Sequence, residues 1–416
     1  MQLSGPNSAG VESRNRLPFI AMMSGTFISL VGSQMTAVAL PWLVLATTGS
    51  AAQAGLVGFA QTVARLAIGF GAGIVVDWYG YRLISVSSDL GAAVTLGLIA
   101  ALSATGNLLF GWLLVLVILT TFFQVPGESA RRRVLPELGA LAGVPLERSN
   151  ATFESVYQMA LLIGPVLSGI LIAVVGPQAG IGFDGASFLV SALLVLFTLP
   201  AGLLPPVARE AASFQALINA QREGFAWLRS DLVTLTMSVQ LSVSILLINA
   251  PLFPVLLPVL NEQRPEGSIG LGVAFATFAV GALAGSLAYG WIGATLPRWP
   301  TWAVRFAVIP LPLWAMAAEL STAFTLISLA TCGLIQGVTN PLVATVRFER
   351  VPVELRGRVF AALGTVIGVA PPIGILTAGF ATDRLGLPAT ALLLAVLAQI
   401  LAGFVIATPG GARVQS

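Results

Sequence analysis

The sequence contains no lysine, no histidine and a single cysteine, and only 9% of its 416 residues are charged. Soluble domains carry about 25% charged residues, so this composition excludes an ordinary soluble fold. Because histidine is missing, only carboxyl groups could carry a proton near neutral pH. Cys332 cannot form a disulfide within the chain, and we expect it to be a small packing residue in an apolar helix.

Motifs for nucleotide hydrolysis, metal binding and covalent catalysis are also missing. Nothing in the sequence resembles a Walker A loop, a metal-ligand cluster or a catalytic triad. A membrane enzyme would need nucleophiles, acids or histidines clustered at one membrane face, and we find no such cluster. We therefore predict a protein that is not an enzyme and that uses no metal and no cofactor.

Long apolar runs are the dominant feature of what is present. Hydrophobic residues make up 56% of the chain, and the mean hydropathy is +0.93. Runs of about 20 residues, which cross a hydrocarbon core of roughly 30 Å, recur from Leu17 to Thr408. They start near residues 17, 53, 83, 108, 149, 180, 231, 269, 302, 322, 359 and 388. We predict an all-α polytopic membrane protein with twelve transmembrane helices and no soluble catalytic domain.

The arginines predict how these helices are oriented. The first sixteen residues lack the apolar core and cleavage site of a signal peptide, so the first span should direct insertion. With the amino terminus in the cytoplasm, Arg264 and Arg384 lie outside, Arg65 lies within a span, and the other seventeen arginines are cytoplasmic. The net charge of +3 then reflects the topology, and no nucleic-acid partner is expected.

The chain also looks duplicated. The segment "RRRVLPEL" (131–138) is echoed by "RFERVPVEL" (347–355), and each precedes a proline-glycine segment, "GPVLSG" (164–169) or "PPIG" (371–374). The offsets between these pairs are near half the chain length. We predict two pseudo-symmetric six-helix bundles with a substrate path between them.

The domain boundaries follow from the longest polar segment. We expect residues 1–204 to form the N-terminal bundle, 205–230 a cytoplasmic connector, and 231–416 the C-terminal bundle. Apolar residues alternate with charges in the connector, which suits a helix on the cytoplasmic face, and a disordered linker is the alternative.

The segment "GIVVDWYGYR" (73–82) resembles the signature loop of the major facilitator superfamily through Gly73, Asp77, Gly80 and Arg82. "GPVLSG" resembles the antiporter motif of the same superfamily. Further segments are similar to the branch of drug:proton antiporters that contains macrolide and enterobactin exporters. These are Asp89, "RRRVLPEL", Asn150, "FDGASF" (183–188) and "VPVELRGRV" (351–359).

This resemblance implies a secondary transporter that exports a small amphipathic molecule in exchange for protons by alternating access. It implies a multi-pass protein in the inner membrane of a bacterium, with both termini cytoplasmic. The expected partners are a small-molecule substrate, protons and the lipid bilayer, with the protein acting as a monomer. The alternatives are a non-transporting sensor or scaffold on the same fold, or an importer or uniporter.

The signature loop has a physical interpretation of its own. Gly73 would let helices approach closely, Gly80 would permit a tight turn, and Asp77 and Arg82 would sit at the membrane interface. Asp77 could hydrogen-bond the amino end of a neighbouring helix, such as the eleventh, in one conformation and act as a latch. Alternatively, Arg82 is one more cytoplasmic cation and Asp77 is its counter-charge.

Four charges are expected inside the membrane. Arg65 should lie near the bilayer centre, where a charge costs at least about 2.5 kcal/mol, so it either contacts substrate or joins a structural pair. With no acid required at the same depth, it would favour an anionic substrate, unless a helix tilt brings Glu154 or Asp184 close enough to neutralise it. Asp89, Glu154 and Asp184 are the candidate proton carriers; structural roles are the alternative for Asp89 and Asp184, and Glu154 could pair with Arg131–Arg133.

Neutral polar residues in apolar spans should line the cavity or join helices by hydrogen bonds. The candidates for substrate contact, besides Arg65, are Gln34, Gln61, Gln158, Gln240, Asn249, Gln336 and Asn340. Asn249 and Asn340 each precede a proline, where unpaired carbonyl groups could meet a ligand. Helix breaks are expected at Gly164, Pro165, Pro371 and Pro372, acting as flex points or as passive kinks.

Overall fold

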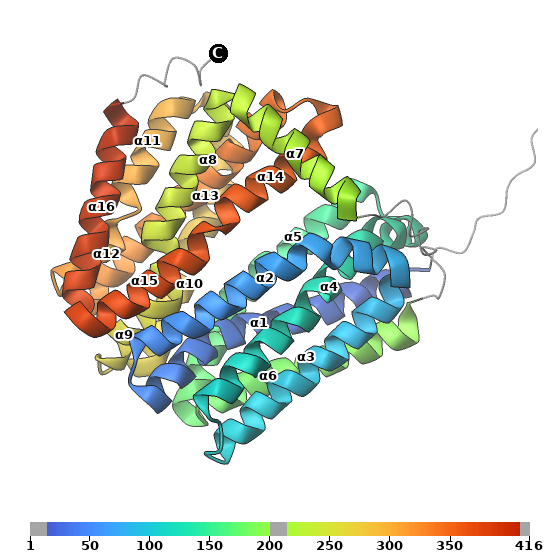
Figure 1. Cartoon of the computed structure of the whole chain (residues 1–416), viewed down its shortest axis with the longest axis horizontal. Helices are drawn as coiled ribbons and strands as arrows, with labels where there is room; N and C mark the ends of the chain where they lie inside the picture. The colour runs from blue at the N-terminus through green and yellow to red at the C-terminus, as the bar shows by residue number, and fades with distance from the viewer. Residues whose placement is uncertain (1–14, 200–213, 408–416) are drawn as a thin grey trace, which may run out of the picture.

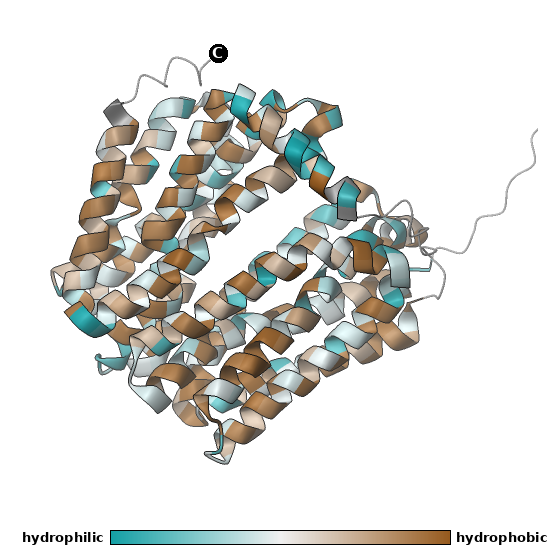
Figure 2. Ribbon diagram, in the orientation of Figure 1, coloured by the Kyte–Doolittle hydropathy of each residue, from teal (hydrophilic) through white to brown (hydrophobic). Residues whose placement is uncertain are grey.

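The computed structural model describes residues 15–199 and 214–407, and within these ranges every regular element is a helix. Eleven helices of this described part are long and apolar enough to cross a membrane. The prediction of an all-α polytopic membrane protein is confirmed. Large apolar side chains on the outer surface agree with it, since Trp291 is 89% exposed and Ile400 64% exposed, and hydrophobic residues cover much of the outside of the helices (Figure 2).

The first half of the chain forms one group of six helices (Figure 1). They are α1 (Leu17–Thr48), α2 (Ala51–Tyr79), α3 (Tyr81–Ala104), α4 (Phe110–Ala142), α5 (Leu146–Val174) and α6 (Pro177–Thr198). The turn between α1 and α2 follows from two residues: Gly49 ends α1 in the left-handed conformation with φ of 64°, and the Ser50 side chain caps α2 by accepting from the Gln53 amide.

The second half is a separate group in the same view, and it contains more short elements. They are α7 (Phe214–Ser230), α8 (Leu232–Ser244), η1 (Ile245–Asn249), η2 (Leu252–Leu256), α9 (Leu257–Glu262), α10 (Gly267–Ile292), η3 (Gly293–Thr295), α11 (Arg298–Val308), α12 (Leu311–Ala317), α13 (Thr322–Arg350), η4 (Val353–Leu355), α14 (Arg356–Gly368), α15 (Ala370–Leu385) and α16 (Leu387–Ala407). The ninth predicted span is the broken pair α11 and α12, interrupted at Ile309 and Pro310, so the described residues do not form twelve uninterrupted helices.

The described part of the connector is helical. Residues 205–213 of the predicted connector lie outside the described residues, whereas α7 packs on α14 with Leu228 buried and an ion pair between Glu223 and Arg358. The next helix, α8, is capped by Asp231, which also pairs with Arg350 at 2.8 Å. Partial burial raises the pKa of Asp231, but hydrogen bonds from Arg350 and Thr234 outweigh it and hold the pKa below its ordinary value.

The span from α8 to α9 widens instead of breaking at its prolines. Both η1 and η2 are π-helical, and they flank Pro251, while Pro254 lies within η2. Proline has no amide hydrogen to complete an α-helical bond, and a π-helical turn keeps the neighbouring carbonyl groups bonded. π-helical turns are frequent at functional sites.

The predicted helix breaks have different outcomes. The helix is interrupted at Val369, between α14 and α15, directly before Pro371 and Pro372 in the first turn of α15. In contrast, α5 runs continuously through Gly164 and Pro165, so the predicted break is not found there. A Cβ at Gly164 would lie 2.5 Å from the Gln34 Cβ, which shows that this glycine serves close packing of α5 on α1.

The two halves meet mainly through two helix pairs, α2 with α15 and α5 with α10, with smaller contacts of α1 and α2 on η2. A Cβ at Gly55 would lie 2.9 Å from the Ile375 carbonyl oxygen, and one at Gly169 would lie 2.7 Å from the Ser268 carbonyl oxygen. Both contacts therefore require a residue without a side chain. They lie at the end of the molecule that carries the α1–α2 turn, which we call the closed end.

The opposite end of α2 is not packed against the other half. A side chain at Gly69 or Gly73 would meet no described atom within 4 Å, and α2 and α14 diverge beyond the contact between Leu66 and Gly368 (Figure 1). The expectation that Gly73 brings two helices together is therefore wrong for this conformation.

An aspartate from the second half caps a helix of the first half at the closed end. Asp383, near the end of α15, accepts hydrogen bonds from the Ser50 hydroxyl at 2.6 Å, the Ala51 amide at 2.7 Å and the Ala52 amide at 3.1 Å. The amino end of a helix carries unpaired amides and partial positive charge, so it suits a carboxylate. We call this contact the Asp383 clasp.

Candidate functional site

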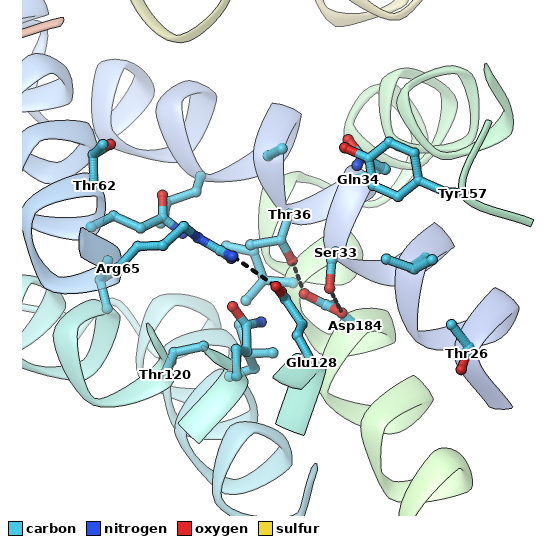
Figure 3. A pocket seen from close by; sticks show the side chains of 18 of the residues that line it. Thr26, Ser33, Gln34, Thr36, Thr62, Arg65, Thr120, Glu128, Tyr157 and Asp184 are labelled. Atoms are coloured by element: carbon cyan, nitrogen blue, oxygen red, sulfur yellow. Dashed lines mark hydrogen bonds and ion pairs between the residues drawn. The ribbon is translucent and has the colours of Figure 1, made fainter. Parts of the chain in front are cut away.

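A cavity of about 510 Å³ lies inside the N-terminal half, within the size range of small-molecule sites. Polar side chains from α1, α2, α4, α5 and α6 converge on it (Figure 3). Its polar and charged lining residues are Thr26, Ser33, Gln34, Thr36, Gln61, Thr62, Arg65, Thr120, Gln124, Glu128, Arg131, Arg132, Tyr157 and Asp184. We call it the polar cavity.

Arg65 faces Glu128 across the polar cavity. The guanidinium of Arg65, near the middle of α2, donates to Glu128 of α4 at 2.9 Å, and the two side chains are 45% and 42% exposed (Figure 3). The assumption that no acid lies at the depth of Arg65 is therefore wrong, and the preference for an anionic substrate that rested on it is withdrawn. Glu128 was missed because α4 continues as a helix to Ala142, well past its apolar run.

Asp184 lines the same cavity, and it is fully buried. Its carboxylate accepts from Thr36 at 2.7 Å and from Ser33 at 3.3 Å, both on α1 (Figure 3). The backbones come this close because position 32 is glycine, where a Cβ would lie 2.7 Å from the carboxylate. Within the described residues, all partners of this carboxylate are hydroxyl groups, including Ser187.

Asp89 has a different environment. Arg131 donates to it at 2.7 Å and Ser191 at 2.7 Å, and the two charged side chains are only 1% and 7% exposed. Asp89 does not line the polar cavity, although Arg131 does. Removing one member of such a buried pair costs about 3–5 kcal/mol, because the other charge is left without a partner. The geometry therefore favours the structural alternative for Asp89.

The three neighbouring arginines point to three different partners. Arg131 pairs with Asp89, Arg132 lies 5.0 Å from the centre of the Phe153 ring, and Arg133 pairs with Asp77 at 2.9 Å. Glu154 instead accepts from Gln158 at 2.7 Å, on the exposed side of α5. The expected pairing of Glu154 with this cluster is not found, and neither Glu154 nor Gln158 lines the polar cavity.

The signature loop is bound within the N-terminal half in this conformation. Gly80 connects α2 to α3 with φ of 83°, and Arg82 donates to the Leu196 carbonyl oxygen at 2.6 Å. Asp77 pairs with Arg133 and not with the eleventh span. A latch that engages in another conformation stays a prediction.

Polar residues of the C-terminal half contact each other rather than the polar cavity. Trp302 donates to Gln240 at 2.8 Å, and Asn249 donates to Gln336 at 3.0 Å. Arg305 donates to Thr339 at 2.6 Å and to Asn340 at 3.4 Å. Arg305 is 1% exposed, so counting it among the cytoplasmic arginines was wrong; α11 carries it into the bundle interior.

Of the eight predicted substrate-contact residues, the polar cavity brings together Gln34, Gln61 and Arg65. Prediction from sequence missed Ser33, Thr36, Gln124, Glu128 and Tyr157, which line the same cavity. The hydroxyl residues carry no hydropathy signal, because serine and threonine are common in transmembrane helices where they bond to the preceding turn.

The sequence model of the Major Facilitator Superfamily matches residues 22–374. The chain belongs to the major facilitator superfamily. Because this family and the matching relatives are transporters, the chain is a membrane transporter and not an enzyme, and the predicted resemblance is confirmed.

Two curated relatives cover nearly the whole chain. Multidrug efflux pump Tap of Mycobacterium tuberculosis is 32% identical over 93% of this chain and 92% of the relative. Macrolide efflux protein A of Streptococcus pyogenes is 24% identical, over 89% of this chain and 91% of the relative. Both of these relatives are named as efflux proteins.

Solved structures match the fold. The nucleoside transporter NupG superimposes with a TM-score of 0.70 at 15% identity, over 94% of this chain and 98% of that chain. A bacterial homologue of the iron transporter ferroportin, solved in an inward-facing state, has a TM-score of 0.70 at 16% identity, over 94% of this chain and 99% of that chain. At these identities the likeness shows the fold alone.

Proposed function

We propose that the protein exports a small amphipathic molecule in exchange for protons, by alternating access. The observation that carries the proposal is the polar cavity, where the buried Asp184 and the Arg65–Glu128 pair occupy one space. An ionised carboxylate is costly to bury without a cation. Asp184 is therefore suited to gain and lose a proton as its surroundings change. The efflux named for both relatives supports the direction of transport.

In the proposed arrangement, residues 1–204 and 231–416 are two halves that move against each other, and residues 205–230 connect them. The arginine distribution supports a place in the inner membrane of a bacterium with both termini cytoplasmic. The closed end then faces the outside, and the polar cavity loads from the cytoplasm. The working unit is a monomer in the lipid bilayer.

Each polar side chain receives a role from its contacts. Gln34, Gln61, Arg65 and Glu128 contact the polar part of the substrate, because they line the polar cavity. Asp184 carries the proton. Asp89 holds α3 to α4 through Arg131, and the polar residues of the C-terminal half join helices by hydrogen bonds.

Substrate-dependent proton flux in proteoliposomes tests the proposal. The purified protein is reconstituted in liposomes loaded with a pH-sensitive dye, and ethidium and a macrolide are added as probes. We expect proton movement that starts with the probe and that opposes the movement of the probe. A protein that moves neither probe nor protons would be a sensor or scaffold, and probe movement without protons would identify a uniporter.

The ion pair predicts opposite charge selectivities for two variants. Glu128→Gln leaves Arg65 without its counter-charge, so the apparent KM should fall for an anionic amphiphile and rise for ethidium. Arg65→Gln should do the reverse. We expect changes of about tenfold, because the half-exposed pair is partly screened by water. Concentration-dependent efflux of ethidium and of anilinonaphthalene sulfonate measures both.

Glu154→Gln is the matched control, since it removes a carboxylate from α5 outside the polar cavity. Its selectivity should equal that of the unmodified protein. If Arg65→Gln and Glu128→Gln weaken transport of both probes by the same factor, the pair supports the structure and does not contact the substrate.

A further inference from the structure

A second cavity of about 200 Å³ lies between the two halves at the closed end. It is walled by α1 and α2 from the first half and by η2 and α10 from the second. Its lining is apolar except for Gln61, and its bulkiest members are Phe253 and Phe275. We call it the aromatic annex.

The aromatic annex adjoins the polar cavity. Ala37, Leu40 and Gln61 line both spaces, so one ligand can extend from one into the other. Arg65 follows Gln61 by one helical turn, which is a rise of about 6 Å along α2. A ligand with its apolar end in the annex and its polar end at the Arg65–Glu128 pair therefore needs a spacer of only a few bonds.

The fold positions the aromatic rings specifically. Phe253 lies in the π-helical η2, and its ring centre is 5.1 Å from that of Phe275 and 4.8 Å from that of Phe278. The rings meet at interplanar angles of 58° and 68°, which resemble the edge-to-face arrangements that aromatic pairs prefer. Phe278 contacts the Phe253 ring but does not line the annex.

We infer that the aromatic annex binds a single aromatic ring at the apolar end of the transported molecule, while the polar end lies at the Arg65–Glu128 pair. This inference rests on the proposed export function and names its substrate class: amphiphiles with one phenyl-sized ring on a short spacer. A benzene ring fits an apolar protein cavity of about 150 Å³, so the annex, at about 200 Å³, matches one ring more closely than a fused pair.

The position of the annex also links ring binding to the transport cycle. Its walls come from both halves, so the ring is enclosed only while the closed end is shut. When the halves separate there, Phe253 and Phe275 move away from α1 and α2, and the ring loses its contacts with one side of the annex. Opening of the closed end of the protein therefore weakens binding of the apolar end of the transported molecule at the moment of release.

Ring-size selectivity of the purified full-length protein tests the inference. The probes are 4-phenylbutylamine and 4-(1-naphthyl)butylamine, and calorimetry measures their Kd values. The two Kd values are first corrected for the difference in how the two probes partition into lipid without protein. After this correction, the unmodified protein should bind the phenyl probe with the lower Kd. Phe275→Ala enlarges the annex, so the ratio of the two Kd values should shift toward the naphthyl probe by about tenfold. Phe275→Leu should shift it in the same direction by less, and provides a milder variant should the alanine variant fold poorly.

Phe278→Ala is the matched control, because it removes a ring that touches Phe253 without lining the annex. It should leave the ratio of the two Kd values unchanged. The inference is overturned if neither probe binds, or if both Phe275 variants and Phe278→Ala change both Kd values equally. Efflux of 4-phenylbutylamine from proteoliposomes is measured separately: a ratio shift without any efflux would overturn the proposed export function and leave the annex in place.

Discussion

Replacing Asp184 by asparagine is expected to abolish proton-driven export, with a loss of at least about a hundredfold in rate. Asparagine has nearly the same shape: its carbonyl oxygen still accepts from Thr36, and its amide nitrogen can donate to the Ser33 oxygen, so the contact between α1 and α6 should persist. It cannot bind or release a proton. The variant should therefore bind the probe normally but fail to carry out the step of the transport cycle that depends on proton exchange.

Two measurements on the same proteoliposomes separate coupling from binding. Export driven by a pH gradient should disappear in Asp184→Asn, whereas exchange of labelled for unlabelled ethidium at equal pH should continue. Full pH-driven export by this variant would rule out Asp184 as the proton carrier and direct attention to Glu128, the other carboxylate on the polar cavity.

Asp89→Asn is the matched comparison, because it neutralises a membrane aspartate with a different partner. It leaves Arg131 buried without its counter-charge, which costs about 3–5 kcal/mol. We expect a lower yield of folded protein and a lower thermal unfolding temperature, with the pH dependence of export kept in the protein that does fold.

Most of the fold could be predicted from the sequence. The membrane sets the length of the apolar runs, and the arginines are distributed unequally between its two sides. The ninth span is the exception. Its apolar run was recognised, but Pro310 splits it into α11 and α12, and Arg305 is carried into the bundle where Thr339 and Trp302 meet it. A count of charges along the chain cannot tell a buried arginine from one at the membrane surface.

The candidate site was less predictable because it depends on which helix faces which. Arg65 was recognised as a membrane charge, but its partner Glu128 is on α4, 63 residues away, beyond the end of an apolar run. Asp89 and Asp184 look alike in sequence, and only the packing of α3, α4 and α6 gives one an arginine and the other two hydroxyl groups of α1. Tertiary contacts thus decide which aspartate is structural.

The polar residues of the C-terminal half show the same limit. Gln240, Asn249 and Gln336 are polar residues in apolar spans, and this pattern predicted that they line a cavity. Their amides instead bond to Trp302 or to each other. Either outcome satisfies the demand that a polar group in hydrocarbon finds a partner. From the sequence one can predict that each polar group needs a hydrogen-bond partner, but not whether that partner is a ligand or another side chain.

Replacing Asp383 by asparagine is expected to open the closed end. The Asp383 clasp holds the amino end of α2 through three hydrogen bonds to one carboxylate, and bonds to a charged group contribute about 1.5–3 kcal/mol each. The amide can replace part of the hydrogen bonding but not the attraction of a negative charge to the helix end. We expect the ratio of open to closed molecules to rise by about tenfold or more.

Distances between spin labels at Asn107 and Gln263 report this change, since both residues lie in exposed turns at the closed end, one in each half. The labels are attached to Asn107→Cys and Gln263→Cys in a Cys332→Ala background, because Cys332 is the only native thiol. Asp383→Asn should increase the population of the longer distance. Arg384→Gln, which removes the neighbouring charge from the same helix end, should leave the distribution unchanged. Identical distributions for Asp383→Asn and the unmodified protein would mean that the glycine contacts at Gly55 and Gly169 alone keep this end shut, and that the carboxylate only caps a helix.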